Sequence, residues 1–366
     1  MRIVARTTLW SAALLVCLCA TVVTSAALGP ADISVLAVTK AVLNAIALPT
    51  GASLSITDGT VGSAGVPMPV LDLSYTSPFS FTVDATQETI VRDIRLPRIV
   101  LGAVVGFALA TAGTVMQGFF RNPMADPSII GVSSGAAVGA VATIAFPLAV
   151  PFGLQTAAFV GAVVTAAAVY LIATENGKTP VATLLLAGVA IQTFLGAVIS
   201  YMLLHTGEGL NEAVVWLMGH LNRATWSDVE VTLPLAVVLF AVLLVYARDL
   251  NVLLLGEEEA QSLGIEVEWT KRLLLAGSSI ITAAAVAVAG VIGFVGLIIP
   301  HMMRLVVGPD HRILIPTSAL AGASFLVLAD TLARTGPAEV PVGIVTAAVG
   351  APFFLFLLRR REVHAL

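Results

Sequence analysis

This sequence has unusually little charge. Only 11% of its 366 residues are charged, whereas a soluble domain has about 25%. Its 18 basic and 22 acidic side chains are too few to cover a compact globule of this length. The scarcity argues against a cytosolic enzyme and against a disordered chain. The net charge of −4 argues against a nucleic-acid partner.

Cysteine is nearly absent as well. Cys17 and Cys19 are the only two, and both lie in the first apolar run. Two residues apart on a helix, they point about 200° apart, so they cannot form a disulfide with each other. Their spacing does not match a metal site either. We interpret them as small apolar residues facing lipid or neighbouring helices.

Residue patterns for catalysis are also missing. The five histidines lie on separate segments with no ligand spacing between them. Gly177-Lys178-Thr179 looks like the end of a phosphate-binding loop, but the first glycine of such a loop would fall at Ile172. We therefore expect no metal, no cofactor and no nucleotide site in this chain. If ATP drives this protein, another subunit binds it.

Apolar residues are what the sequence has in excess. They make up 58% of the chain, and the mean hydropathy is +1.00. A membrane helix needs about 20 mostly apolar residues. Runs of that length lie at about 8–28, 99–119, 128–148, 152–173, 181–204, 230–247, 272–290, 312–333 and 341–358. A tenth run, 293–308, is shorter, and we expect Pro300 to interrupt it. The sequence predicts an all-α polytopic membrane protein with about ten transmembrane helices, forming one domain over residues 1–366.

The orientation of these spans follows from the basic residues. The first run resembles a secretory signal peptide, but it is long for one, and its removal would leave an odd number of spans. With the N-terminus inside, 12 of the 18 lysines and arginines are cytoplasmic. We therefore expect a multi-pass protein of the cell membrane with both termini in the cytoplasm.

Three connections are long enough to carry function. Residues 29–94 are expected outside, with a helix over 32–48 along the membrane surface and an irregular loop over 48–86. Residues 205–229 are also expected outside, and residues 248–271 are expected in the cytoplasm. Within the spans, Gly102 and Gly106 have GxxxG spacing, as do Gly131, Gly135 and Gly139. These stripes indicate close helix packing, although spacing alone does not separate packing from a pathway lining.

Buried charge would mark an ion-coupled route, and the span centres contain almost none. Asp330 and Arg334 are four residues apart near an outer helix end, where they can pair. The lack of a mid-span carboxylate argues against a proton- or sodium-driven transporter, although backbone carbonyls can also bind sodium.

The cytoplasmic connection contains a short amphipathic helix. Gly256 precedes Glu257 to Glu259, whose carboxylates favour a helix N-terminus, and Gly264 can end the helix as a left-handed cap. Ala260 and Leu263 give it an apolar edge. Two interpretations stay open: a helix lying flat on the bilayer, or a knob that fits a cleft on a cytoplasmic partner.

An ordered series of motifs covers residues 90–358. It comprises Arg95-Leu96-Pro97-Arg98, Gln117, Arg121-Asn122-Pro123-Met124-Ala125-Asp126-Pro127, Trp216-Leu217-Met218-Gly219, Leu250-Asn251, Leu255-Gly256, Ser262-Leu263-Gly264, Gly293-Phe294-Val295-Gly296, Pro300-His301, Arg304, Asp330 to Arg334, Glu339 to Gly343 and Gly350-Ala351-Pro352-Phe353. The series resembles the FecCD/BtuC-type permease subunits of type II ABC importers for vitamin B12, ferric siderophores and haem. It departs from them at Met124, where leucine is usual, and in the length of the 48–86 loop.

The resemblance implies a homodimeric permease with a substrate pathway along the subunit interface. It is not itself an enzyme. Two cytoplasmic ATPase subunits would grip a coupling segment that includes Leu255, Gly256, Glu257, Ala260, Leu263 and Gly264. An extracytoplasmic substrate-binding protein would dock through Arg95 or Arg98 and through Arg334. For each arginine, local charge pairing is the alternative.

Two further segments have structural or gating roles in this interpretation. Pro123 and Pro127 bar a continuous helix, Asn122 or Asp126 can cap the next one, and Arg121 would anchor the inner interface. Gly290, Gly293 and Gly296 permit a bend between the seventh and eighth spans, next to Pro300, that gating could use.

The cargo is not fixed by any motif. Overall similarity favours cobalamin (vitamin B12), with a ferric siderophore or haem as the alternative within the same family. A less favoured class is an ion-coupled secondary transporter, which would need no ATPase. A membrane-embedded scaffold or enzyme would need polar groups clustered at depth, which the sequence lacks.

Overall fold

The computed structural model describes residues 3–29, 33–45, 48–61, 64–146, 153–336 and 338–359. The helices of the first half are α1 (Ile3–Ala27), α2 (Val35–Ala45), α3 (Ala85–Thr89), α4 (Leu96–Phe119), α5 (Val132–Ala145), α6 (Gly153–Ala173) and α7 (Val181–His205). Those of the second half are α8 (Leu210–Leu217), α9 (Trp226–Val245), α10 (Ala247–Leu253), α11 (Glu257–Ser262), α12 (Val267–Ala289), α13 (Val295–Val307), α14 (His311–Thr335) and α15 (Val342–Arg359). A π-helical stretch, Ile90–Arg95, joins α3 to α4, and short 3₁₀ turns lie at Pro127–Ile130 and Gly207–Gly209.

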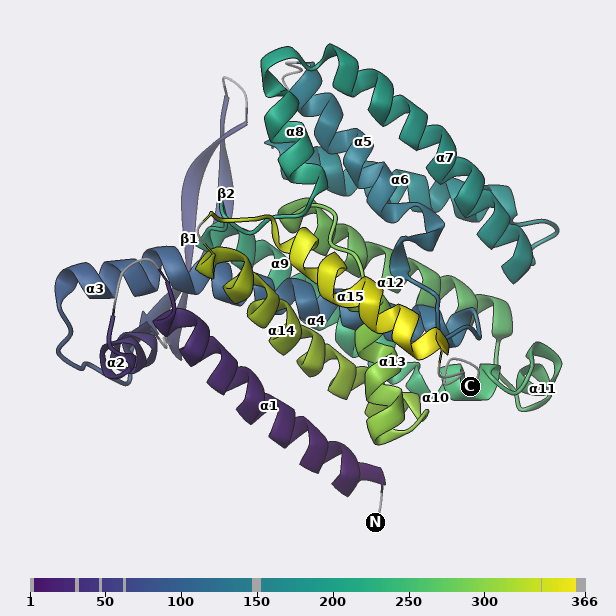
Figure 1. Cartoon of the computed structure of the whole chain (residues 1–366), viewed down its shortest axis with the longest axis horizontal. Helices are drawn as coiled ribbons and strands as arrows, with labels where there is room; N and C mark the ends of the chain where they lie inside the picture. Colours follow the sequence, from purple (N-terminus) through teal and green to yellow (C-terminus); the bar gives the residue numbers. More distant parts are fainter. Residues whose placement is uncertain are drawn as a thin grey trace.

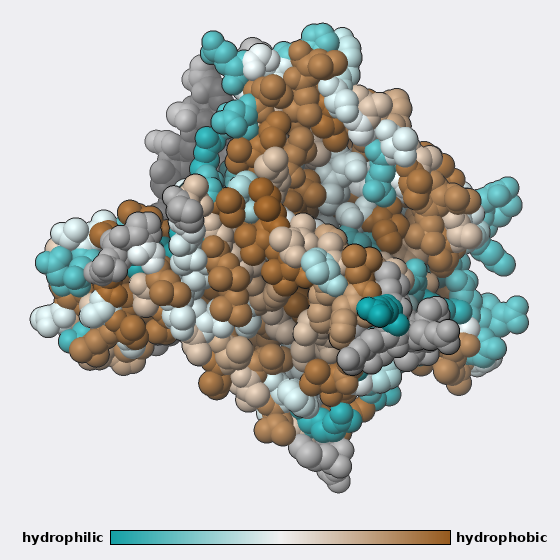
Figure 2. Space-filling view, in the orientation of Figure 1, coloured by the Kyte–Doolittle hydropathy of each residue, from teal (hydrophilic) through white to brown (hydrophobic). Residues whose placement is uncertain are grey.

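The apolar runs correspond to helices one for one. Seven described helices are long and apolar enough to cross a membrane: α1, the continuous α3–α4, α6, α7, α9, α12 and α14. The other three runs form the shorter apolar helices α5, α13 and α15. Apolar side chains cover most of the visible surface, and polar ones gather toward its margins (Figure 2). The prediction of a helical, multi-pass membrane protein is confirmed.

Helix α4 forms the centre of the bundle. It packs against α9, α12, α13 and α14, and most of its residues are buried. Glycine makes this possible: a Cβ placed on Gly106 would overlap the carbonyl oxygen of Gly322 on α14. A Cβ on Gly139 of α5 would likewise overlap the carbonyl oxygen of Ala157 on α6. The packing interpretation of these glycines is confirmed, because the helix backbones meet there directly.

Residues 48–61 and 64–76 form an antiparallel pair of strands, β1 (Leu48–Val61) and β2 (Ala64–Thr76), here called the hairpin. The expectation of an irregular loop over 48–86 was therefore wrong for this part, while residues 77–84 have no regular structure. The Gly and Pro residues suggested a loop, but the intervening Val, Ile, Thr and Tyr favour strands. In Figure 1 the hairpin projects from the body of the molecule near α2 and α3.

The long helices run between two ends of the molecule (Figure 1). The first, here called the hairpin end, carries α2, α3 and the hairpin. Within the stretch 32–48, where a helix was expected, residues 35–45 form α2, whose Val38 and Ala41 are buried with Ala26 and Val91. Leu48 belongs to β1 instead. The second, here called the α11 end, carries α10 and α11.

The start of the described chain lies at the α11 end. The Arg6 guanidinium donates to the carbonyl oxygen of Val307, at the last residue of α13. The last described helix, α15, also ends toward the side of α10 and α11 (Figure 1). The two ends of the described chain therefore lie on one side, as an even number of spans requires. Residues 1–2 and 360–366, which hold part of the basic charge used for the orientation, lie outside the described residues.

Candidate functional site

Helix α11 is held at both ends by glycines in conformations that favour glycine. Gly256, with φ +145°, precedes it, and Gly264, with φ +85°, follows it. The N–H of Gly264 donates to the carbonyl of Gln261, and the N–H of Ile265 donates to that of Ala260. The predicted left-handed cap at Gly264 is confirmed, because these bonds satisfy carbonyls at the helix end.

The knob formed by residues 255–264 exposes apolar side chains at its two flanks. Leu255 is 66% exposed and Leu263 is 65% exposed, whereas Ala260 is fully buried. Trp269, which is close to the knob in sequence and lies at the start of α12, is 55% exposed. Exposed large apolar side chains grouped in this way indicate an interaction surface, for a partner or for the bilayer, since water covers them poorly.

One lysine ties this knob to α12. The buried Lys271 ammonium lies 3.2 Å from a carboxylate oxygen of Glu257 and 3.1 Å from one of Glu268. Glu257 opens α11, and Glu268 lies in the first turn of α12. A displacement of α11 therefore acts on the base of a spanning helix through a paired, buried charge.

A second connection runs from α10 to α14. The Asn251 amide nitrogen donates to Asp310 at 2.8 Å, and the backbone N–H of His311 donates to the Asn251 amide oxygen at 2.9 Å. Hydrogen bonds from Arg312 lower the pKa of Asp310 to about 2, so its carboxylate stays charged as the N-cap of α14. Sequence reasoning missed this role of Asn251, because its partners lie about 60 positions away.

The hairpin end holds a buried ionic cluster. Arg98 makes a bidentate pair with Asp330, with distances of 2.8 to 3.1 Å, and also contacts Glu339 at 2.7 Å. The predicted Asp330–Arg334 pair is present at 3.6 Å, and Arg334 also donates to the backbone carbonyl and hydroxyl of Ser25 on α1. The Asp330 side chain is only 3% exposed. Local pairing of these arginines, the alternative stated above, is what the structure shows.

Arg95 lies deeper than the docking interpretation requires. Its side chain is buried, and its guanidinium donates to the carbonyl oxygens of Ala26 and Ala27 at the end of α1. A side chain in this position does not face a docking partner. In this conformation Arg95 fastens α1 to the start of α4.

The connection after α4 is a rigid turn. Arg121 is exposed and has a positive φ of 48°, a conformation that costs energy for any residue with a Cβ. The Asn122 side chain accepts the N–H of Met124, and Asp126 caps the 3₁₀ turn that begins at Pro127. Of the two expected caps, Asp126 therefore caps this 3₁₀ turn, whereas the next helix, α5, begins after Gly131 without a side-chain cap.

The predicted break between the seventh and eighth apolar runs, which form α12 and α13, is also confirmed. Residues 290–294 are not helical, and Gly290 and Phe294 both have a φ of +70°. A Cβ on Gly293 would meet open space. A Cβ on Gly296 would lie 2.8 Å from the Pro127 ring, so Gly296 serves packing.

Pro300 does not interrupt its helix, contrary to the expectation, since α13 runs from Val295 to Val307. Proline removes the hydrogen bond that the carbonyl of Gly296 would otherwise accept. The Gln117 amide of α4 lies 3.4 Å from that carbonyl and 2.9 Å from the carbonyl of Leu297. Donation from a neighbouring helix lets the proline remain inside a helix.

No group of three or more His, Cys, Asp and Glu residues that could hold a metal ion is found among the described residues. The arrangement therefore offers two mechanical connections at the α11 end and an ionic cluster at the hairpin end. These contacts can hold the helices in fixed positions relative to one another and can transmit a displacement from one helix to the next.

Comparisons with known proteins agree on one group. A protein-family model described as the FecCD transport family matches residues 17–360. The Cobalamin import system permease protein BtuC of Halobacterium salinarum is 58% identical over 364 residues, covering 99% of both chains. The Hemin transport system permease protein HmuU of Yersinia pestis is 43% identical over 311 residues, covering 82% of this chain and 92% of that protein.

A solved structure is similar over nearly the whole chain. It is described as an inward-facing conformation of a metal-chelate type ABC transporter. The TM-score is 0.77 at 30% sequence identity, with 96% of this chain and 98% of that chain covered.

Proposed function

Because the chain belongs to the FecCD transport family, we propose that it carries cobalamin across the membrane as the permease of an ATP-driven importer. It is a membrane permease of the ABC importer type, as are its curated relatives. The observation that carries the choice of cargo is the 58% identity to a cobalamin permease across 99% of both chains. The hemin permease reaches only 43%. A ferric siderophore or haem remains the alternative cargo.

The pathway is proposed to run between two copies of the chain. The cavity between α6 and α12 has a volume of about 240 Å³, below the roughly 300–1,000 Å³ of typical ligand pockets. A larger cavity, of about 860 Å³, lies among the charged residues around α11 and the start of α12, not between the spanning parts of the helices. A large chelate therefore needs a wider passage through the membrane than the α6–α12 cavity gives. Helix α7 supplies a further argument, since Leu186, Phe194 and Leu204 are all more than 60% exposed. A homodimer would cover part of such a face, and lipid would cover the rest.

The energy is proposed to come from two separate ATPase subunits at the α11 end. The sequence contains no phosphate-binding loop of its own. The exposed Leu255 and Leu263 give a partner a surface to grip, and Lys271 and Asn251 carry the resulting displacement to α12 and α14. Both chain ends would then be cytoplasmic.

The substrate-binding protein is proposed to dock at the hairpin end. Arg98 and Arg334 lie there, and Glu339, which pairs with Arg98, is 47% exposed at its side chain. An incoming carboxylate could replace Glu339 on Arg98 without disturbing the buried Asp330. The break at residues 290–294, including Gly293, is the proposed place where gating bends the chain.

Uptake in a strain that lacks its own cobalamin permease tests the cargo. The chain, expressed with its ATPase and binding-protein partners, is expected to restore uptake of labelled cobalamin and not of ferric siderophore or haem. Each cargo is supplied at the same concentration, and cells with the permease alone serve as the control. Restored ferric siderophore or haem uptake without cobalamin uptake would contradict the proposed cargo.

A further inference from the structure

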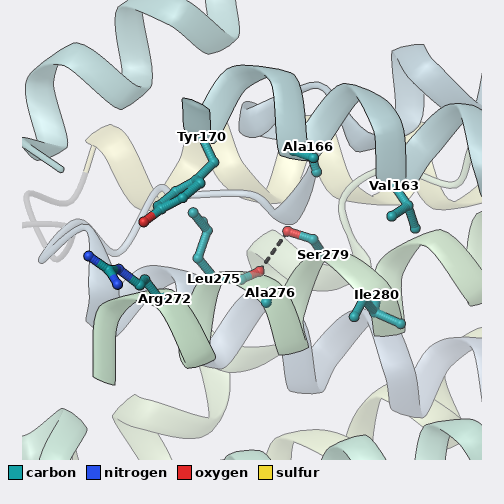
Figure 3. A pocket seen from close by; sticks show the side chains of 9 residues that line it. Val163, Ala166, Tyr170, Arg272, Leu275, Ala276, Ser279 and Ile280 are labelled. Atoms are coloured by element: carbon teal, nitrogen blue, oxygen red, sulfur yellow. Dashed lines mark hydrogen bonds between the residues drawn. The ribbon is translucent and has the colours of Figure 1, made fainter. Parts of the chain in front are cut away.

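A groove lies between α6 and α12 (Figure 3), and Arg272, at one end of it, also lines the cavity beside α11. Its walls come from one face of each helix, and it holds about 240 Å³. Both helices are long and apolar enough to cross the membrane. Ala167 and Ala276 line it and are exposed, so the groove is open sideways to the surroundings of the bundle. In a membrane protein, those surroundings are lipid.

The groove is polar at one end and apolar at the other. Figure 3 shows the Tyr170 hydroxyl and the Arg272 guanidinium near one end, and Val163 and Ile280 at the opposite end. The only other hydroxyl in the lining, on Ser279, donates to a backbone carbonyl of its own helix at 2.6 Å. From Val163 to Tyr170 the groove extends about 10 Å along α6, against roughly 15 Å for half of the hydrocarbon core.

Arg272 has hydrogen-bonding capacity to spare. It is exposed, donates to the carbonyl oxygen of Gly177 at 3.2 Å, and makes no ion pair within the residues that the structure describes. Its neighbour Lys271 differs, because that ammonium is buried between Glu257 and Glu268. The Tyr170 hydroxyl likewise makes no hydrogen bond to another described residue.

The charges around Arg272 indicate what kind of headgroup fits. Lys178 and Arg272 both line the adjoining cavity at the α11 end. Four glutamates also line it, Glu257, Glu258, Glu266 and Glu268. Two of them, Glu257 and Glu268, are paired with Lys271, so the lining carries no excess of positive charge. Such a mixed environment suits a single phosphodiester better than a multiply charged headgroup.

We propose that this groove binds a phospholipid of the surrounding bilayer. One hydrocarbon chain lies between α6 and α12, and the phosphate accepts hydrogen bonds from Arg272 and Tyr170. Grooves with basic residues between transmembrane helices are suited to lipid headgroups in this way. Because Arg272 follows Lys271 in the chain, the bound lipid steadies the base of α12 next to the ion pairs that hold α11.

Lipid retention by the purified full chain tests the proposal. Native mass spectrometry compares phosphatidylglycerol with diacylglycerol of the same chains, which lacks the phosphate. We expect the chain to retain phosphatidylglycerol in preference, and Arg272→Gln to weaken that retention about tenfold, as for a lost charged hydrogen bond. Arg248→Gln, which changes another exposed arginine at the same end, is the matched control and should retain the lipid as the unsubstituted chain does.

A second variant tests the apolar part of the groove. Ala276→Trp places a ring in the groove and should lower retention of both lipids, whereas Val164→Trp, on an exposed part of α6 outside the groove, should not. Equal retention by Arg272→Gln and the unsubstituted chain would overturn the proposal. So would a loss of self-association in Ala276→Trp with lipid retention unchanged, because the groove would then be a contact between copies.

Discussion

Replacing Asp330 with alanine is expected to lower the free energy of unfolding by about 3–5 kcal/mol, enough to prevent accumulation of the folded protein. Asp330 is the shared partner of Arg98 and Arg334, and its side chain is 3% exposed. Without it, two poorly exposed guanidinium groups lose their buried counter-ion. The bidentate pair that joins α4 to α14 at the hairpin end would also be lost.

Glu339→Ala is the matched control for this prediction. It removes the other carboxylate from Arg98, but that carboxylate belongs to a side chain that is 47% exposed. Exposed pairs contribute about 0–1 kcal/mol, so the effect should be small. Thermal unfolding in detergent measures the effect of both substitutions. It is monitored by the loss of the protein's monodisperse size-exclusion peak. Equal melting temperatures for Asp330→Ala and Glu339→Ala would show that burial does not set the strength of this cluster.

Disrupting the knob is expected to abolish transport while leaving the fold intact. Leu263→Glu changes a side chain that is 65% exposed, so the permease should insert and melt as before. A carboxylate replacing an apolar contact should weaken ATPase binding by at least about tenfold. Gly264→Trp should likewise uncouple uptake from ATP hydrolysis; its φ of +85° adds strain, although the space around its Cβ is open.

Copurification of the ATPase subunit and cobalamin uptake are the two measurements for the knob. Arg248→Gln, an exposed change at the same end but outside residues 255–264, should leave both unchanged. Uptake at the unsubstituted rate by Leu263→Glu and Gly264→Trp would remove the coupling role from this segment.

The sequence predicts features that depend on local pattern. The ten helices follow from apolar length, because lipid admits little else. The ends of α11 can be predicted from the glycines on either side of it. The capping role of Asp126 can be predicted from its position before Pro127. In each case the residues that cause the structure are neighbours in the chain.

Features that depend on long-range partners could not be predicted in the same way. Arg98 and Asp330 are 232 positions apart, so the sequence indicated only Arg334, four residues away, as the ion-pair partner of Asp330. The donor that serves the carbonyls of Gly296 and Leu297 next to Pro300 is Gln117, which belongs to another helix and lies about 180 positions away. Arg95 was an alternative to Arg98 for docking, since nothing in the sequence shows that the end of α1 covers it.

Reconstitution tests the central claim, that the chain is a passage driven by partner subunits that hydrolyse ATP. Proteoliposomes containing the permease with its ATPase and binding protein are expected to accumulate labelled cobalamin only when ATP is supplied on the ATPase side. Vesicles with the permease alone should not accumulate it under an imposed proton or sodium gradient. Accumulation by the permease alone, driven by such a gradient, would contradict the account.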